Sequence, residues 1–148
     1  APVSELIAQQ SWIDAAYSAE TVPQIVSRLR SSGVAEAEKA AEQILGKSPT
    51  AVTVTLRALR QARELESLEA VLDQEFRVST ASLRSHDLVE GIRAQVVEKD
   101  RNPQWSPAQL SDVDAEQVES YFAPLGDREL GLSQTYAAQV GGAQEGRS

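Results

Sequence analysis

The chain's only histidine, His86, stands directly before Asp87, and this pair is the first candidate for chemistry. A histidine beside a carboxylate can act as an oriented general base. The alternative is a structural histidine at a helix start, whose ring hydrogen-bonds the backbone. No serine or cysteine in a nucleophile-elbow pattern lies nearby, and a triad carboxylate must approach from the correct side of the ring. We therefore expect the structural role.

Asp87 and Glu90 form a second candidate, because they are one helical turn apart and share a face. Paired carboxylates can divide the roles of acid and base. They can equally complement the positive end of a helix dipole, with Glu90 paired to Arg93. We expect this second role. One histidine and scattered carboxylates lack the spacing of metal ligands, so the sequence indicates no metal site.

Lys99 and Arg101 form the third candidate, since both follow the end of a predicted helix. Flexible cationic side chains in that position meet either solvent or a phosphate of a ligand. The alternative is that they only neutralise the negative end of the helix. Trp12 and Trp105 are expected to be packing anchors, because an indole ring buries a large area and needs one partner for its N–H.

The elements that must position these groups are all predicted to be helical. Around the candidates, Leu88, Ile92 and Val96 recur every four residues from His86 onward, and the helix ends in the charged run 98–103. Other helices are predicted over 4–17, from Thr21 to Gly33, over 34–45, from Ser48 and Pro49 onward, from Ser67 to Ser85 or His86, and after Asp114. Alternation with period two is nearly absent. The chain is therefore predicted to be all-α, with about six or seven helices.

Each helix is expected to turn its apolar side inward. In the helix that starts at Ser67, this buried side is predicted to comprise Leu68, Val71, Leu72, Phe76 and Leu83. The residues predicted to face water there are Glu69, Asp73 and Arg77. The β-branched run 51–56 is assigned to a helix because Val52, Leu56 and Leu59 continue a helical face. Residues 1–132 are predicted to form one helical region, and 133–148 a loosely ordered tail.

The composition is that of a globular domain and excludes several classes of function. The chain has 148 residues, 41% hydrophobic and 24% charged, with a net charge of −8. Such an acidic chain is repelled by nucleic acid and by anionic membranes, so we expect neither as a partner. The absence of cysteine excludes disulfides and thiolate chemistry. No apolar run has the length of a membrane span and no signal peptide is visible, so we expect a cytoplasmic protein.

The stretch from His86 to Trp105 resembles the C-terminal region of the 3-hydroxyisobutyryl-CoA hydrolases, a branch of the enoyl-CoA hydratase (crotonase) superfamily. The residues that carry this resemblance are His86, Asp87, Glu90, Gly91, Arg93, Ala94, Lys99, Asp100, Asn102, Pro103, Trp105 and Pro107. An earlier block, 48–50 followed by 54–60, resembles the preceding helix of that branch. In family order the resemblance extends over roughly residues 7–125.

The resemblance implies that this chain is the helical C-terminal part of a CoA-thioester hydrolase of valine catabolism. In such enzymes the catalytic carboxylates and the oxyanion-hole amides lie in an N-terminal half, so no catalytic residue is expected here and the chain alone is expected to be inactive. No cofactor is implied, because CoA is part of the acyl-CoA substrate. The chain also lacks methionine, even at position 1, which fits a fragment. A eukaryotic source would place the protein in the mitochondrial matrix.

The resemblance also implies a role for the two cations. In related hydratases the lysine of a Glu-Lys pair contacts the phosphates of CoA, and Glu98-Lys99 matches that pair. Lys99 and Arg101 are therefore the predicted CoA-phosphate contacts. An aromatic residue accompanies the pair in hydratases, and Gln95 stands in its place here.

The expected partners are the missing N-terminal half, the acyl-CoA substrate and further copies of the chain in a homo-oligomer. A part built to lie on another half should expose an apolar patch when it is alone. Two alternatives stay open at this point: the C-terminal part of an enoyl-CoA hydratase, and a non-enzymatic helical interaction module.

Overall fold

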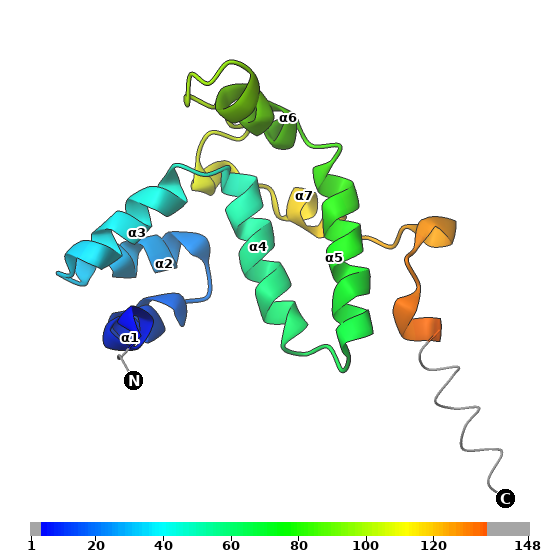
Figure 1. Ribbon diagram of the computed structural model, residues 1–148, viewed down its shortest axis with the longest axis horizontal. Coiled ribbons are helices and arrows are strands. Elements are labelled where there is room, and N and C mark those ends of the chain that lie inside the picture. The colour runs from blue at the N-terminus through cyan, green and yellow to red at the C-terminus, as the bar shows by residue number, and fades with distance from the viewer. Residues whose placement is uncertain (1–3, 136–148) are drawn as a thin grey trace, which may run out of the picture. The chain divides into compact units, whose positions relative to one another are not determined.

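The computed structural model describes residues 4–135, and within that range the chain is helical with no strand (Figure 1). The α-helices are α1 (Glu5–Tyr17), α2 (Val22–Ser31), α3 (Ala35–Leu45), α4 (Pro49–Ala62), α5 (Leu68–Ser82), α6 (His86–Ile92) and α7 (Ala115–Ser120). A π-helical turn, η1 (Arg93–Val97), follows α6, and η2 (Leu110–Asp112) and η3 (Gly126–Arg128) are short 3-10 turns. The prediction of an all-α chain is confirmed. None of the described helices is long and apolar enough to cross a bilayer.

The chain folds into two compact units. Unit 1 comprises the described residues up to 56 together with 104–113, and unit 2 comprises 57–103 together with the described residues from 114 onward. The boundary falls inside α4, so the first half of this helix belongs to unit 1 and the second half belongs to unit 2. The predicted division of the chain into 1–132 and a tail stays a prediction, and 136–148 lie outside the described residues.

The helix ends of unit 1 form as their sequence predicts. Thr21 caps α2 in a capping box, in which its hydroxyl accepts from the Gln24 N–H and the Gln24 side chain accepts from the Thr21 N–H. Gly33 follows α2 with a φ of 70°, the left-handed conformation that favours glycine. Ser48 caps α4 through the N–H of Ala51 at 3.0 Å. These bonds satisfy backbone groups that the helices themselves leave free.

The core of unit 1 is aliphatic and lies around α2, which packs along α3 (Figure 1). Leu29 of α2 is 0% exposed. The other buried members of this core are Ala16, Ala19, Val22, Ile25, Val26, Ala37 and Ala41. Trp105 anchors the 104–113 segment by donating its Nε1–H to the carbonyl of Gly46 at 3.3 Å. The predicted packing role of Trp105 therefore includes a hydrogen bond.

In unit 2, α5 turns the opposite face inward from the one its sequence predicts. Asp73 and Gln74 are buried, and Asp73 is only 6% exposed. The exposed residues are Leu68, Leu72, Phe76 and Leu83, with Leu68 at 68%. The predicted burial of these four residues is wrong, as is the predicted exposure of Asp73. Leu59 on α4 is also exposed, whereas Val54 and Ala58 are the buried residues of that helix.

Hydrogen bonds explain why the polar face of α5 is turned inward. The Asp73 carboxylate accepts from the N–H of Leu132, the N–H of Ser133 and the Ser133 hydroxyl, at 2.9, 3.0 and 2.6 Å. Gln74 donates its Nε2–H to the Ala58 carbonyl at 3.1 Å. A buried carboxylate with three donors avoids the penalty of an unpaired charge. These bonds attach the segment around Ser133 to α5.

Unit 2 has a smaller apolar cluster at α7. Asp114 caps this helix by accepting from the N–H of Glu116 at 2.9 Å, as predicted. Val118, Tyr121 and Phe122 are buried and form its apolar side. The Arg57 guanidinium lies over the Phe122 ring, 4.4 Å from its centroid.

Candidate functional site

The candidate site begins at α6, whose start is fixed by local capping. The Ser85 hydroxyl accepts from the N–H of Leu88 at 3.2 Å. The exposed His86 ring places Nδ1 3.0 Å from Oδ1 of Asp87, so it contacts a carboxylate and not the backbone atom that was predicted. This contact could orient the ring, but the ring itself faces solvent.

After α6 the helix widens into a π-turn, which the sequence did not predict. The Glu98 N–H donates to the carbonyl of Arg93 at 2.8 Å, a bond that spans five residues. Ala94 is fully buried at the base of this turn. The apolar stripe predicted for this helix exists, but it is exposed to solvent.

Lys99 and Arg101 follow the π-turn in an unusual backbone conformation. Their φ angles are 58° and 55°, in the left-handed region that costs L-residues about 1–2 kcal/mol each. Two hydrogen bonds donated by backbone N–H groups hold this loop. The Arg101 N–H donates to the carbonyl of Ala94 at 3.0 Å, and the Asn102 N–H donates to Oδ1 of Asp100 at 2.9 Å. Surroundings that over-determine a strained backbone are a feature of ligand sites.

The Arg93 guanidinium is the centre of the loop's ionic contacts. Its Nη2 and Nε bind the two oxygens of Glu90 at 2.7 and 2.8 Å, which confirms the predicted pairing. Its Nη1 binds Oδ2 of Asp100 at 2.6 Å and also binds Glu98. Its Nη2 donates further to the carbonyl of Asn102 at 3.2 Å. One side chain therefore joins α6 to both ends of the loop.

The charged groups of this cluster shift each other's pKa. The pKa of Arg93 is raised, first by its hydrogen bonds to Glu90 and then by those to Asp100 and Glu98. The pKa of Asp100 is lowered, first by the Asn102 N–H and then by Arg93. Both groups therefore stay charged at neutral pH, and the ionic cluster persists.

Lys99 and Arg101 are exposed, and within residues 4–135 neither forms an ion pair with a carboxylate. The three carboxylates nearest in sequence, Glu90, Glu98 and Asp100, are instead bound by Arg93. The structure thus places two cations on one loop, directed to solvent, which is an arrangement suited to an anion. Their predicted contact with CoA phosphates stays a prediction.

Sequence reasoning identified the two cations and the Glu90–Arg93 pair but missed the role of Arg93 as the centre of the cluster. The Glu90–Arg93 spacing of three residues is visible in any helix. Glu98 and Asp100 lie five and seven residues after Arg93, and only the π-turn and the left-handed loop bring them to its guanidinium.

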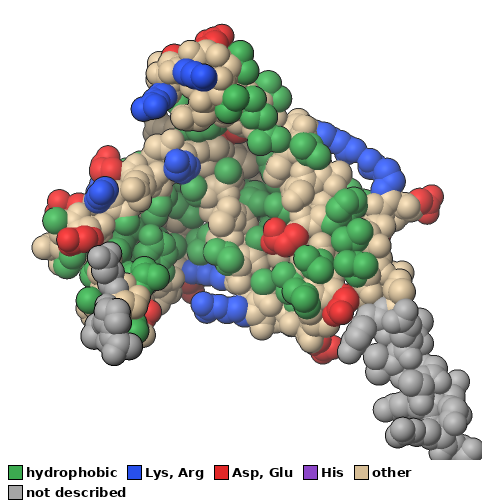
Figure 2. All heavy atoms as spheres, viewed as in Figure 1, with side chains coloured by type: hydrophobic (Ala, Val, Ile, Leu, Met, Phe, Trp, Pro, Cys, Tyr) green, Lys and Arg blue, Asp and Glu red, His purple; other side chains and the backbone are tan. Residues whose placement is uncertain are grey.

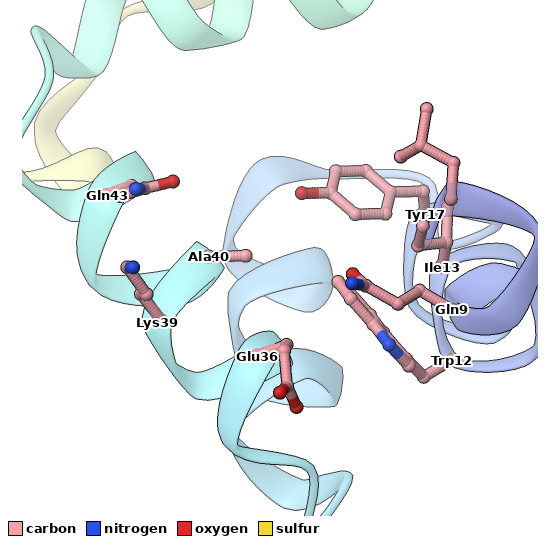
Figure 3. Close-up of a pocket in the computed structure, with 9 residues that line it drawn as sticks. Gln9, Trp12, Ile13, Tyr17, Glu36, Lys39, Ala40 and Gln43 are labelled. Carbon is pink, nitrogen blue, oxygen red and sulfur yellow. The ribbon is translucent and has the colours of Figure 1, made fainter. Parts of the chain in front are cut away.

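Unit 1 contains a separate open groove of about 480 Å³ between α1 and α3 (Figure 3). Trp12, Ile13 and Tyr17 of α1 face Ala40 of α3 across it, with Glu36 and Lys39 beside them. Trp12 therefore lines a groove as well as packing against the core. Among the residues that the structure places, no group of three His, Cys, Asp or Glu side chains could hold a metal ion.

An apolar surface covers α5 and the α6–η1 segment, and Figure 2 shows hydrophobic side chains gathered over both helices. Its members, here named the apolar face, are Leu68, Leu72, Phe76, Leu83, Leu88, Val89, Ile92, Val96 and Val97. An exposed apolar surface was predicted, although α5 was not expected to contribute to it. Contiguous apolar surface on a protein marks an interaction site more often than a solvated face.

Comparison with known proteins places these features in a family. The family model described as enoyl-CoA hydratase/isomerase matches residues 1–122. The mitochondrial 3-hydroxyisobutyryl-CoA hydrolase of Gallus gallus is 41% identical over 120 residues, which cover 81% of this chain and 31% of that protein. The Homo sapiens protein of the same name is 37% identical over 118 residues, which cover 80% and 30%.

Two solved structures are similar as well. A carnitinyl-CoA dehydratase from Mycobacterium thermoresistibile is 52% identical with a TM-score of 0.82, over 88% of this chain and 37% of that one. An enoyl-CoA hydratase from Rhodobacter sphaeroides 2.4.1 is 33% identical with a TM-score of 0.80, over 88% and 38%. The chain thus spans about a third of the length of these proteins. By its match over most of its length, the chain belongs to the enoyl-CoA hydratase/isomerase family of the crotonase superfamily.

Proposed function

We propose that this chain is the helical C-terminal part of a CoA-thioester hydrolase that acts on 3-hydroxyisobutyryl-CoA, in valine catabolism. The observation that carries the proposal is the 41% identity with a 3-hydroxyisobutyryl-CoA hydrolase over 81% of this chain. In this proposal the reaction is hydrolysis of the thioester to the free acid and CoA. The groups that polarise the carbonyl and activate the nucleophile lie outside this sequence.

The loop of Lys99 and Arg101 supports a role for this chain in binding the substrate. CoA carries several phosphate groups, and two exposed cations on a restrained loop suit such an anion. This chain would thus fix the nucleotide end of the acyl-CoA, while the acyl end reaches the remainder of the enzyme. No separate cofactor is required, because CoA is part of the substrate.

The apolar face supports a second role, which is docking on the N-terminal half of the same polypeptide. The chain accounts for 31% of the length of the Gallus gallus relative, so most of such a protein lies outside it. Covering Leu72 and Phe76 would remove their apolar surface from water and stabilise the assembly.

We further propose that the parent protein forms a homo-oligomer. We also propose that it resides in the cytoplasm, or in the mitochondrial matrix of a eukaryote; the printed names of the hydrolase relatives include the word mitochondrial.

The enzymatic proposal is tested by measuring the release of free CoA thiol from 3-hydroxyisobutyryl-CoA. The full-length parent protein is expected to release thiol, and the 148-residue chain alone is expected to release none. Turnover by the chain alone would contradict the proposed division of labour. If the parent neither turns over nor binds acyl-CoA, a non-enzymatic helical interaction module becomes the better account.

A second candidate is the C-terminal part of an enoyl-CoA hydratase. It is favoured by the 33% identity with an enoyl-CoA hydratase structure and the 52% identity with a carnitinyl-CoA dehydratase structure. A hydratase adds water across the double bond of an enoyl-CoA and leaves the thioester intact. Loss of the enoyl absorbance without release of thiol would therefore favour this candidate over the hydrolase.

A further inference from the structure

We infer that Arg93 is a positioning residue, which holds the 98–102 loop in the conformation that presents Lys99 and Arg101 to the phosphates of CoA. The inference rests on the proposed function for the identity of the ligand. It adds that recognition depends on a side chain that itself faces the carboxylates of the loop and not the ligand.

The first step of the argument is geometric. The Arg93 guanidinium binds Glu90 on α6, Asp100 in the loop and the Asn102 carbonyl at the loop's end, over distances of 2.6 to 3.2 Å. The loop between these points contains the two left-handed residues, Lys99 and Arg101. Without a tether on both sides, the chain would relax from this sparsely populated conformation.

The second step is electrostatic. Glu90, Glu98 and Asp100 carry three negative charges within this short segment, and Arg93 binds all three. If Arg93 were absent, those carboxylates would attract Lys99 and Arg101 and would repel a phosphate group. By occupying the carboxylates, Arg93 keeps both cations available for an anionic ligand.

The third step concerns why this residue is arginine. Several nitrogens of one planar guanidinium, Nε, Nη1 and Nη2, are used at once. A lysine at this position keeps the positive charge, but its single ammonium cannot reproduce this fork. The substitution Arg93→Lys therefore keeps the positive charge and removes the forked hydrogen bonds. It tests whether the hydrogen-bond geometry of Arg93, and not only its charge, holds the loop.

The test compares two substrates of the full-length parent protein, 3-hydroxyisobutyryl-CoA and the corresponding pantetheine thioester, which lacks the nucleotide and its phosphates. Arg93→Lys is expected to raise KM for the CoA thioester by roughly tenfold, because preorganisation of the cations is lost. Its KM for the pantetheine thioester, and kcat for both, should stay near those of the unmodified protein. Hydrogen exchange of residues 98–102 should become faster.

Arg77→Lys is the matched control. Arg77 also binds a carboxylate, Glu129, through Nε at 2.9 and 3.0 Å within unit 2, but it lies on α5 and this carboxylate lies outside the 98–102 loop. This control should leave the ratio of the two KM values unchanged. Asp100→Asn is the second variant, for the case in which Arg93→Lys does not fold. It removes only one of the contacts of Arg93, so it should also raise KM for the CoA thioester, but by a smaller factor.

Equal KM changes for both thioesters, or no change for either, would overturn the inference, since a general loss of stability does not distinguish the substrates. Lys99→Ala and Arg101→Ala separate this failure from failure of the proposed function. If they weaken CoA binding while Arg93→Lys does not, the inference is wrong and the proposed site stands. If they leave calorimetric binding of free CoA unchanged, the proposed CoA contact is wrong and the inference falls with it.

Discussion

In unit 1 the inward position of α2 is occupied by Leu29, whereas in unit 2 the inward positions of α5 are occupied by Asp73 and Gln74. The buried core of unit 1 around α2 consists of apolar side chains. Unit 2 places a carboxylate and an amide inside, and leaves Leu72 and Phe76 of the same helix in contact with solvent. Both helices are amphipathic, yet they use their two faces in opposite ways.

The difference teaches that an amphipathic pattern identifies two faces but does not identify which surface covers each of them. In α2 the covering surface belongs to the same chain. In α5 the polar face meets the segment around Ser133, and the apolar face has no cover within residues 4–135. We propose that its cover lies on another polypeptide segment, because exposed apolar surface marks interaction sites.

The largest expected effect is in the core of unit 1. Leu29→Ala removes a side chain that is 0% exposed, so the free energy of unfolding should fall by about 3 kcal/mol. The measurement is urea denaturation followed by tryptophan fluorescence, which reports unit 1 because Trp12 and Trp105 both lie there, and by far-UV circular dichroism, which reports the helices of both units. The matched control in unit 2 is Leu68→Ala, which should change stability by no more than about 0.5 kcal/mol in the isolated chain. Equal losses of unfolding free energy in the two variants would contradict the difference between the buried Leu29 and the exposed Leu68.

A smaller effect is expected from the inverted face of α5. Asp73→Ala leaves the N–H groups of Leu132 and Ser133 without their acceptor, and should destabilise unit 2 by about 2 kcal/mol. Urea denaturation followed by far-UV circular dichroism measures this loss. The exposed Asp127 gives a control, Asp127→Ala, which is expected to be close to neutral. If Asp73→Ala is as mild as its control, the polar interior contributes nothing to unit 2.

The helix ends of unit 1 could be predicted from sequence, and the orientation of α5 could not. Thr21, Gly33 and Ser48 act on backbone groups within a few residues, so their local sequence is sufficient. The orientation of α5 depends on which surfaces compete for its two faces. One of them, the segment around Ser133, lies some 60 residues away in sequence.

In the candidate site too, contacts between near neighbours in sequence could be predicted, and contacts that depend on the surrounding fold could not. The spacing between Glu90 and Arg93 predicts their contact, because residues three apart are neighbours on any helix. The contact between Arg93 and Asp100 depends on a π-turn and on two left-handed residues, Lys99 and Arg101. Neither residue type favours that conformation, so no local propensity indicated it.

The smallest expected effect is a difference between the two units in their sensitivity to acid. The pKa is lowered for Asp73 chiefly by the Ser133 hydroxyl, for Glu129 and Glu119 by their arginine partners, and for Asp100 by the Asn102 N–H. All four carboxyls lie in unit 2. A lowered pKa in the folded state stabilises above the ordinary values of 3.8 for Asp and 4.5 for Glu, and that stabilisation is lost as the pH falls below them.

Acid should therefore loosen unit 2 before unit 1. In a titration from neutral pH downward, helical circular dichroism is expected to decrease at a higher pH than the pH at which tryptophan fluorescence changes. Asp73→Asn should reduce the gap between the two transitions, because the residue no longer titrates. Coincident transitions would show that the units respond to acid as one.

The central claim is that the apolar face of α5 is covered in the parent protein, and thiol labelling tests it most directly. This chain contains no cysteine, so Leu72→Cys introduces a single reactive group on that face, with Ser120→Cys on α7 as an exposed control. Maleimide labelling, located by peptide mass, should be fast at both positions in the isolated chain. In the full-length parent it should be strongly slowed at position 72 and unchanged at position 120. Equally fast labelling of position 72 in both proteins would contradict the account.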